Sequence, residues 1–311
     1  MRTTKGRLLI ALVIGAGTGS LCGYFMAHLR IGAGDFTWAI NAARDLLARR
    51  NPYEDAKQLY PLPAALFGLP FVLSRPEIAA GTFYGASSAL LAFCVSRHGY
   101  HHLLIFFAYP YWAGVLTAQW IPLIMAGTFY WWLAPAWMAK PQIGLPAALT
   151  SVNRKNFASC LVVGLVSFVI MPHWIPFWLG QIGRYSRFIP LMVLPGPLMA
   201  LALVRFRVSD ARLLFFCACM PQRWFYDGFI LWLIPKTRRE IIFTAGLSWI
   251  PGIWRWFHPP QTFTQVGRWM VIWMYLPMLA VVLLRKARNS PMSQGERGLD
   301  QLLPRANDSS D

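Results

Sequence analysis

Long apolar runs alternate with short polar or basic connections through most of the chain. Residues 8–29 and 78–96 form two such runs, each close to the ~20 residues that an α-helix needs to cross a bilayer. The later runs are shorter, and many contain proline, which ends or kinks a helix. This pattern predicts an all-α integral membrane protein without a soluble second domain.

The basic residues between the runs indicate how the chain crosses the membrane, because Lys and Arg concentrate in cytoplasmic loops. Three basic residues precede the first run, which places the N-terminus in the cytoplasm. If residues 59–74 form a half-inserted outer segment, the later basic clusters fall on one side in a bundle of about 10 to 12 transmembrane helices. Those clusters are Arg97 with His98, His101 and His102; Arg154 with Lys155; Arg205, Arg207 and Arg212; Lys236, Arg238 and Arg239; and Arg285, Lys286 and Arg288. Both termini are then cytoplasmic.

Composition supports this class. Apolar residues make up 56% of the chain and charged residues only 13%, against about a quarter charged in soluble domains. A net charge of +17 would indicate nucleic-acid binding if the basic residues formed a patch on a soluble domain. Here the basic residues lie between apolar runs, so we expect no nucleic-acid partner. The cysteines lie inside apolar runs and lack metal-site spacing. We therefore expect no metal and no cofactor.

The polar stretch after the first run, residues 30–76, is expected to be an outer loop. Residues 35–50 have apolar positions at helical spacing, which predicts an amphipathic helix on the membrane surface. Asn51-Pro52-Tyr53 ends this helix, because the residue before proline avoids the helical region. Asp35 stands at the start of the helix, where aspartate is a favoured N-cap. Its position alone favours a cap over a catalytic group.

Further polar residues fall at the outer ends of the expected helices. An ionised side chain in hydrocarbon costs about 2.5 to 3.5 kcal/mol, so such residues usually face a cavity, a partner or the interface. They are Asp35, Arg44, Gln119, Lys140, Gln142, Gln181, Arg184, Arg187, Arg223, Asp227, Arg255 and His258. We interpret them as walls of one outward site.

Each of these residues also has a simpler interpretation. Lys140 lies between two apolar segments beside Pro141 and could be a snorkelling lysine at a helix end. Gln119 could hydrogen-bond a sugar or cap a helix. Arg184 and Arg187 suit a lipid phosphate or ordinary headgroups. A second set fits an interfacial ion pair, Arg223 with Asp227, and an aromatic belt, Tyr53 with Tyr60.

Six short motifs occur in a defined order over the first half of the chain. They are Gly34-Asp35-Phe36, Ala42-Ala43-Arg44, Asn51-Pro52-Tyr53, Tyr60-Pro61-Leu62-Pro63, Ala118-Gln119-Trp120 and Lys140-Pro141-Gln142. On these motifs the chain resembles the polyprenyl-phosphate-sugar-dependent membrane glycosyltransferases of the GT-C fold, most closely the mannosyltransferases of glycosyltransferase family 87. Ala118 departs from a frequent glycine, and Trp120 from a frequent small or polar residue.

The resemblance implies a GT-C-type polytopic helical bundle in the plasma, or bacterial inner, membrane. A single domain over residues 1–288 would carry its catalytic loop at residues 30–76, followed by a disordered cytoplasmic tail at 289–311. It would transfer a sugar on the outer face from a polyprenyl-phosphate donor to a lipid or glycan acceptor. Mannose is the expected sugar, and arabinofuranose is the alternative.

The resemblance also implies roles for individual residues. Asp35 matches the family's general base. Donor phosphate binding is expected from the cations Lys140, Arg44, Arg223, Arg184 and Arg187. Substrate contacts are expected from Gln119, Gln142, Tyr53, Tyr60, Asp227 and His258. Two other classes stay open: a lipid or glycan transporter or flippase, although we find no internal repeat of the kind common in transporters, and a catalytically silent relative.

Overall fold

The computed structural model describes residues 3–54, 58–183 and 187–285. Within these ranges every regular element is a helix, and the only β-type pairing is an isolated bridge between Phe188 and Gln222. The expected tail at 289–311, and Arg184, lie outside the described residues. The all-α class predicted from the apolar runs is therefore confirmed for the described chain.

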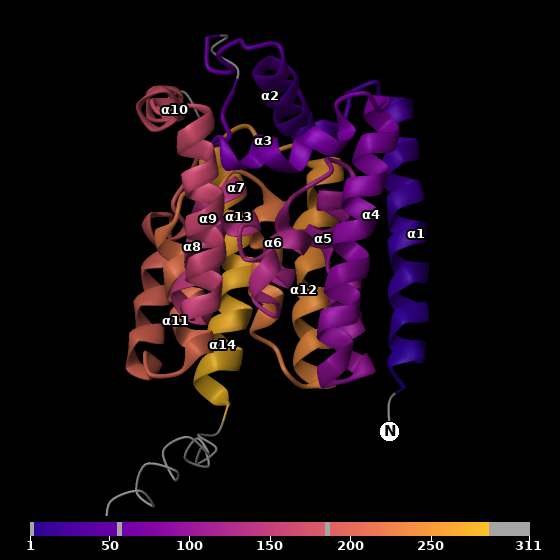
Figure 1. Cartoon of the computed structure of the whole chain (residues 1–311). Helices are drawn as coiled ribbons and strands as arrows, with labels where there is room; N and C mark the ends of the chain where they lie inside the picture. The colour runs from indigo at the N-terminus through magenta and orange to yellow at the C-terminus, as the bar shows by residue number, and fades with distance from the viewer. Residues whose placement is uncertain (1–2, 55–57, 184–186, 286–311) are drawn as a thin grey trace, which may run out of the picture.

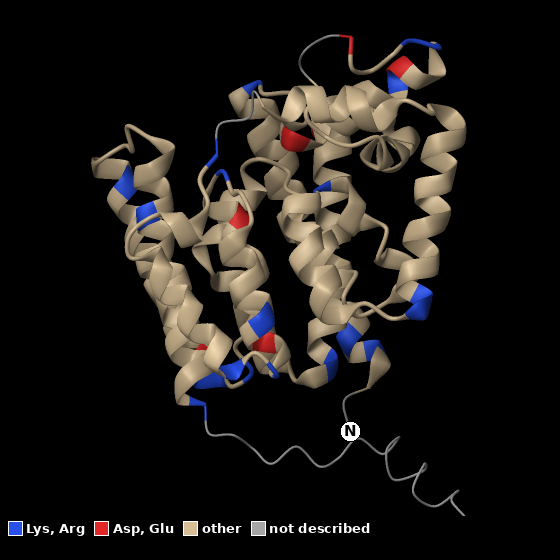
Figure 2. Cartoon of the chain, turned by 90° about the vertical axis from the view of Figure 1, so that its left-hand side faces the viewer, with Lys and Arg blue, Asp and Glu red and all other residues tan. Residues whose placement is uncertain are grey.

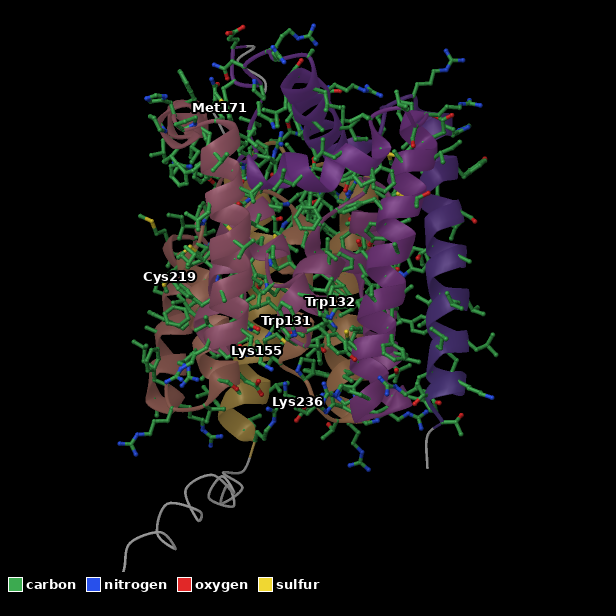
Figure 3. The ribbon with its side chains drawn as sticks, viewed as in Figure 1. Trp131, Trp132, Lys155, Met171, Cys219 and Lys236 are labelled. Atoms are coloured by element: carbon green, nitrogen blue, oxygen red, sulfur yellow. The ribbon has the colours of Figure 1, made fainter. Side chains whose placement is uncertain are left out.

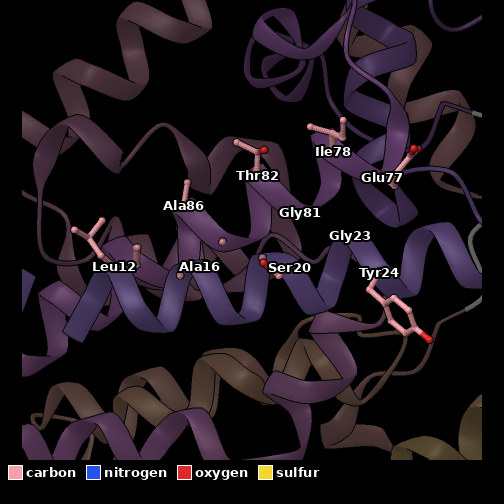
Figure 4. A pocket seen from close by; sticks show the side chains of 14 residues that line it. Leu12, Ala16, Ser20, Gly23, Tyr24, Glu77, Ile78, Gly81, Thr82 and Ala86 are labelled. Atoms are coloured by element: carbon pink, nitrogen blue, oxygen red, sulfur yellow. The ribbon is translucent and has the colours of Figure 1, made fainter. Parts of the chain in front are cut away.

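Helices α1 (Thr4–Leu29) and α4 (Pro76–Val95) lie side by side at one edge of the bundle (Figure 1). Glycines bring their backbones into contact: a Cβ on Gly19 would lie 2.6 Å from the carbonyl oxygen of Gly81. The small residues leave a groove of about 570 Å³ along this pair (Figure 4). Close packing through small residues is typical of helices that associate in lipid.

A layer of short helices covers one end of the bundle, which we call the Asp35 end (Figure 1). It contains η1 (Gly34–Phe36), α2 (Thr37–Leu47), α3 (Pro63–Gly68) and η2 (Leu69–Phe71). The helix expected over residues 35–50 is present but shorter. The chain begins at the opposite, N-terminal end.

The middle of the chain folds into short helical pieces, which prolines at helix starts, such as Pro110, Pro122 and Pro141, help to separate. The pieces are η3 (Ser96–His98), η4 (Tyr100–Phe107), α5 (Tyr109–Val115), α6 (Ile121–Ala126), η5 (Trp131–Leu133), α7 (Ala136–Ala139) and α8 (Pro141–Ser151). Buried aromatic and aliphatic side chains from them form much of the core, including Trp120 and Trp137.

The last part of the chain completes the bundle. Its elements are α9 (Arg154–Ile170), α10 (Trp174–Ile182), η6 (Pro190–Met192), η7 (Gly196–Arg205), α11 (Ser209–Cys219), η8 (Phe225–Leu233), α12 (Arg238–Phe257), α13 (Phe263–Met270), η9 (Val271–Tyr275) and α14 (Leu276–Leu284). Most charged residues lie near the two ends of the bundle (Figure 2). Lys155 and Lys236 mark the N-terminal end, and Met171 lies at the Asp35 end (Figure 3).

Three described helices are long and apolar enough to cross a membrane: Thr4–Leu29, Pro76–His98 and Phe263–Leu284. A fourth span is possible if Arg154–Ile170 and Trp174–Ile182, which meet at 99°, act together. The membrane character of the chain is thus supported, but the expected count of about 10 to 12 spans is not confirmed. Most of the other apolar runs fold into pieces shorter than a single crossing requires.

Candidate active site

A backbone hydrogen bond fixes the position of Asp35. Its N–H donates to the carbonyl of Thr117 at 2.8 Å, which joins the loop before α2 to the loop between α5 and α6. Gly34 has a φ of +58°, and a Cβ there would lie 2.5 Å from the Thr117 oxygen. Glycine therefore allows both the left-handed conformation and the close approach.

The Asp35 carboxylate does not cap a helix. Neither η1 nor α2 has a side-chain cap, and Oδ2 of Asp35 instead accepts hydrogen bonds from the Tyr60 hydroxyl at 2.8 Å and the Gln119 amide at 2.5 Å. Position alone favoured the cap, so this expectation was wrong. Asp35 occupies neither N-cap position, because Ala33 precedes η1 and Phe36 precedes α2.

Gln119 connects Asp35 to a lysine. Its Nε2 donates to Asp35, while its Oε1 accepts a hydrogen bond from Lys140 Nζ at 2.9 Å. The preceding residue, Ala118, has a φ of +49°, a conformation that costs a residue with a Cβ about 1 to 2 kcal/mol. A glycine at this position would remove that cost.

Lys140 lies at the junction of α7 and α8, and its side chain is only 1% exposed. Its Nζ is 2.7 Å from Asp227 Oδ1 and 3.9 Å from Asp35 Oδ2. The Tyr226 ring lies below the ammonium group, with its centroid 4.8 Å away. Lys140 does not snorkel. It is a buried counter-ion to two carboxylates, and burying such charges is tolerable only when they are paired.

Asp227 lies in the first turn of η8 and is fully buried. Its Oδ2 accepts the backbone N–H of Arg223 at 2.9 Å, so the expected pairing of these residues runs through the backbone. The Arg223 guanidinium lies 6.0 Å from the centre of the Phe263 ring. Tyr226 was not predicted as a site residue, although its position next to Asp227 was a signal for it.

Other predicted residues line two cavities near this cluster. Tyr60, Gln142 and Arg187 line a cavity of about 230 Å³ whose other walls are mainly apolar. Arg44 donates to the Val72 carbonyl at 2.9 Å and lines a separate cavity of about 540 Å³ together with Gly34.

Two other predicted residues have local roles. The Tyr53 hydroxyl donates to the Tyr60 carbonyl at 3.2 Å, and burial raises the pKa of Tyr53 so that this phenol stays protonated. His258 is exposed and stacks on Trp254 with 4.2 Å between ring centroids. His258 lies at the C-terminal end of α12.

Within the described ranges, no group of three or more His, Cys, Asp or Glu residues is arranged to hold a metal ion. Comparisons with known protein families, curated proteins and solved structures find no match for this chain. The chemistry of the site therefore has to be argued from its own geometry.

Proposed function

We propose that the protein is a membrane glycosyltransferase that uses a polyprenyl-phosphate sugar, with Asp35 as general base. The observation that carries this proposal is that the Asp35 carboxylate is both partly exposed and held by hydrogen bonds. Its side chain is 18% exposed, while Tyr60 and Gln119 fix its Oδ2. A base needs both reach to a substrate and a fixed orientation, and this carboxylate has both.

The two carboxylate oxygens of Asp35 would have different roles. The hydrogen bonds from Tyr60 and Gln119 both go to Oδ2, so Oδ1 is the oxygen for an acceptor hydroxyl. As that hydroxyl oxygen attacks the anomeric carbon, its proton passes to Oδ1. The bond from the anomeric carbon to the phosphate oxygen breaks, and its electron pair leaves with the phosphate. A positioned base of this kind typically contributes ~10² to 10⁴-fold.

Two cavities next to the cluster would hold the substrates. The cavity of about 230 Å³ shares Tyr60 with the cluster, and its apolar walls Leu59 and Trp178 suit the start of a prenyl chain. Arg187 on the same wall would stabilise the leaving phosphate. The polar cavity of about 540 Å³ beside Gly34 and Arg44 would then take the acceptor on the outer face.

This arrangement gives Lys140 a new role in the proposal. Its ammonium group is enclosed by Gln119, Asp227 and the Tyr226 ring. It would therefore hold Gln119, and through Gln119 the Asp35 carboxylate, in position instead of touching the phosphate. Arg187 thereby becomes the principal phosphate ligand, with mannose the expected sugar and arabinofuranose the alternative.

A transporter is the second candidate, and the same buried ion group favours it. Ionisable residues that pair inside a membrane bundle often mark ion or proton pathways. Here Lys140 lies between Asp35 and Asp227, so proton exchange among them could drive movement of a lipid or glycan. The exposed edge of Asp35 fits a base better, because the other two groups are closed off from solvent.

The deciding experiment measures sugar transfer by purified protein. Labelled polyprenyl-phosphate mannose and a crude lipid extract are incubated with wild type, Asp35→Asn and Glu77→Gln. Glu77 is a matched carboxylate because it pairs with exposed Arg75 outside the cluster. We expect Asp35→Asn to lose about 10² to 10⁴-fold in transfer rate and Glu77→Gln to match wild type.

Each result separates the hypotheses. Undiminished transfer by Asp35→Asn removes Asp35 as base. If wild type transfers no sugar from the mannose or the arabinofuranose donor, the enzyme proposal fails. Donor-independent movement of labelled lipid across proteoliposomes would then establish the transporter.

A further inference from the structure

A second polar cavity, of about 380 Å³, lies at the end of the bundle opposite Asp35. It is built from segments distant in the sequence, with His98 and His102 from η3 and η4, Asp210 from α11, and Trp232 and Lys236 from η8 and the turn after it. Lys236 is labelled at this end in Figure 3. Nothing in the proposed transfer reaction uses these residues.

Two ring nitrogens of the lining residues lack a partner. The indole Nε1 of Trp232 and the Nδ1 of His102 are buried and have no hydrogen bond within the part of the chain that the structure describes. Trp232 is only 2% exposed. An indole N–H can only donate, and leaving a buried donor unsatisfied costs about 1 to 3 kcal/mol. Trp232, which lines the cavity, therefore has a donor that lacks an acceptor within the described residues.

The one carboxylate in the lining is already compensated. Asp210 accepts Arg285 at 2.6 Å and lies 3.2 Å from Lys236 Nζ. Lys236 also donates to the Leu233 carbonyl at 2.5 Å. Its side chain is 51% exposed, so the ammonium group stays accessible. Asp210 consequently does not give the cavity a net negative charge.

His102 lies among other basic residues. Burial is the main cause that lowers the pKa of His102 to about 4, with smaller contributions from His101, His98 and Lys236. The ring centroids of His101 and His102 are 4.2 Å apart. Because Lys236 places a positive charge near this imidazole, an added anion is favourable here.

We propose that this cavity binds a phosphate group, either as a free phosphate or as the headgroup of an anionic phospholipid. The phosphate oxygens would accept from Trp232 Nε1 and the His102 ring, and the Lys236 ammonium would offset their charge. This binding site is independent of sugar transfer and goes beyond it.

The site has a defined pH dependence. The groups facing His102 are His98, His101 and Lys236, and Asp210 also lines the cavity. A bound phosphate favours protonated His102, which raises the pKa of this imidazole. By linkage, phosphate affinity increases as the pH falls towards that pKa.

Inorganic phosphate and defined lipids test the two sources separately. The full-length protein in neutral detergent is titrated with phosphate or chloride at equal ionic strength, and thermal unfolding and the His102 pKa are followed, the latter by NMR of ¹⁵N-histidine. In parallel, native mass spectrometry counts lipids retained from mixtures of phosphatidylglycerol and phosphatidylcholine. We expect stabilisation by phosphate or selective retention of phosphatidylglycerol, together with a raised His102 pKa.

Two substitutions localise the effect. His102→Gln and Trp232→Phe each remove a proposed donor, and Trp232→Phe keeps the aromatic bulk, so we expect about five-fold weaker binding. His28→Gln, at the Asp35 end of α1, serves as the control and should bind as wild type.

The outcomes are distinct. If inorganic phosphate stabilises the protein and raises the His102 pKa, the free ion is sufficient for binding. If phosphatidylglycerol is retained selectively but inorganic phosphate has no effect, the ligand is a lipid headgroup. Either result supports the site. Equal effects of phosphate and chloride with no lipid preference overturn it, as does wild-type binding by both variants.

Discussion

At the scale of single residues, Lys140 determines the electrostatics of the candidate site. Its Nζ lies 2.7 Å from Asp227 Oδ1 and 3.9 Å from Asp35 Oδ2. Removing one member of a buried charge group leaves the others uncompensated, which costs more than the whole group contributes. Lys140 should therefore matter for folding as well as for activity.

Replacement of Lys140 by methionine tests this role. Methionine keeps the length of the side chain but removes the charge beside Asp227, and we expect Lys140→Met to lose about 3 to 5 kcal/mol of unfolding free energy. Adding Asp227→Asn should recover part of this loss, since the amide carries no charge. Thermal unfolding of both single variants and the double variant measures the coupling. Additive losses would show that the two groups do not interact.

At the scale of elements, the site depends on one contact between loops. The loop before α2 and the loop after α5 meet through the hydrogen bond from Asp35 N–H to the Thr117 carbonyl. Both loops use positive φ angles, at Gly34 and at Ala118. These conformations set where the Asp35 carboxylate and the Gln119 amide point.

Gly34→Ala should disrupt that contact. A Cβ at position 34 would lie 2.5 Å from the Thr117 oxygen. The left-handed backbone conformation costs alanine a further ~1 to 2 kcal/mol. We expect at least about ten-fold lower sugar transfer, because 1.4 kcal/mol already corresponds to that factor. Gly180→Ala, where an added Cβ meets nothing within 4 Å, is the control. Equal activity of the two variants would argue against the loop contact as a determinant of the site.

A second element-level feature joins the start of α12 to the end of α14. Glu240 forms a capping box with Thr237 and pairs with Arg285 at 2.9 Å. Burial raises the pKa of Glu240, but hydrogen bonds from Arg285 and from the N–H groups of Lys236 and Thr237 outweigh it, so the pKa is lowered overall.

A lowered carboxyl pKa makes the stabilisation pH-dependent. The contribution of Glu240 is complete above its unfolded pKa and is lost as the pH falls through the lower folded pKa. The melting temperature of wild type should therefore exceed that of Glu240→Gln near pH 7, and the difference should shrink on acidification below about pH 4.5. Thermal scans of both proteins between neutral and acidic pH measure it. A difference that stays constant would contradict this role.

At the scale of the whole molecule, the two polar sites lie at opposite ends of an apolar bundle (Figures 1 and 3). The basic N-terminal end suits the cytoplasmic side, since Lys and Arg are retained there. The Asp35 end would then face outward, as the proposed transfer requires.

Cysteine labelling tests this orientation. In a background with the partly exposed Cys160 and Cys219 replaced, single cysteines are placed at the exposed positions Ala48 and Lys155. We expect an impermeant maleimide to label Ala48→Cys in intact spheroplasts and Lys155→Cys only after lysis. The reverse pattern would place Asp35 in the cytoplasm and exclude an outer active site.

The sequence by itself determined the helical class, the membrane character and the polar loop around Asp35, because apolar run length and proline placement are local properties. It also indicated Gln119, Lys140 and Asp227 as members of one site. Only the tertiary structure decided that Asp35 binds Tyr60 and Gln119 instead of a helix end, and that Lys140 is enclosed between two carboxylates. Those contacts join residues far apart in the chain, so their geometry depends on how the loops fold together and leaves no periodic signal in the sequence.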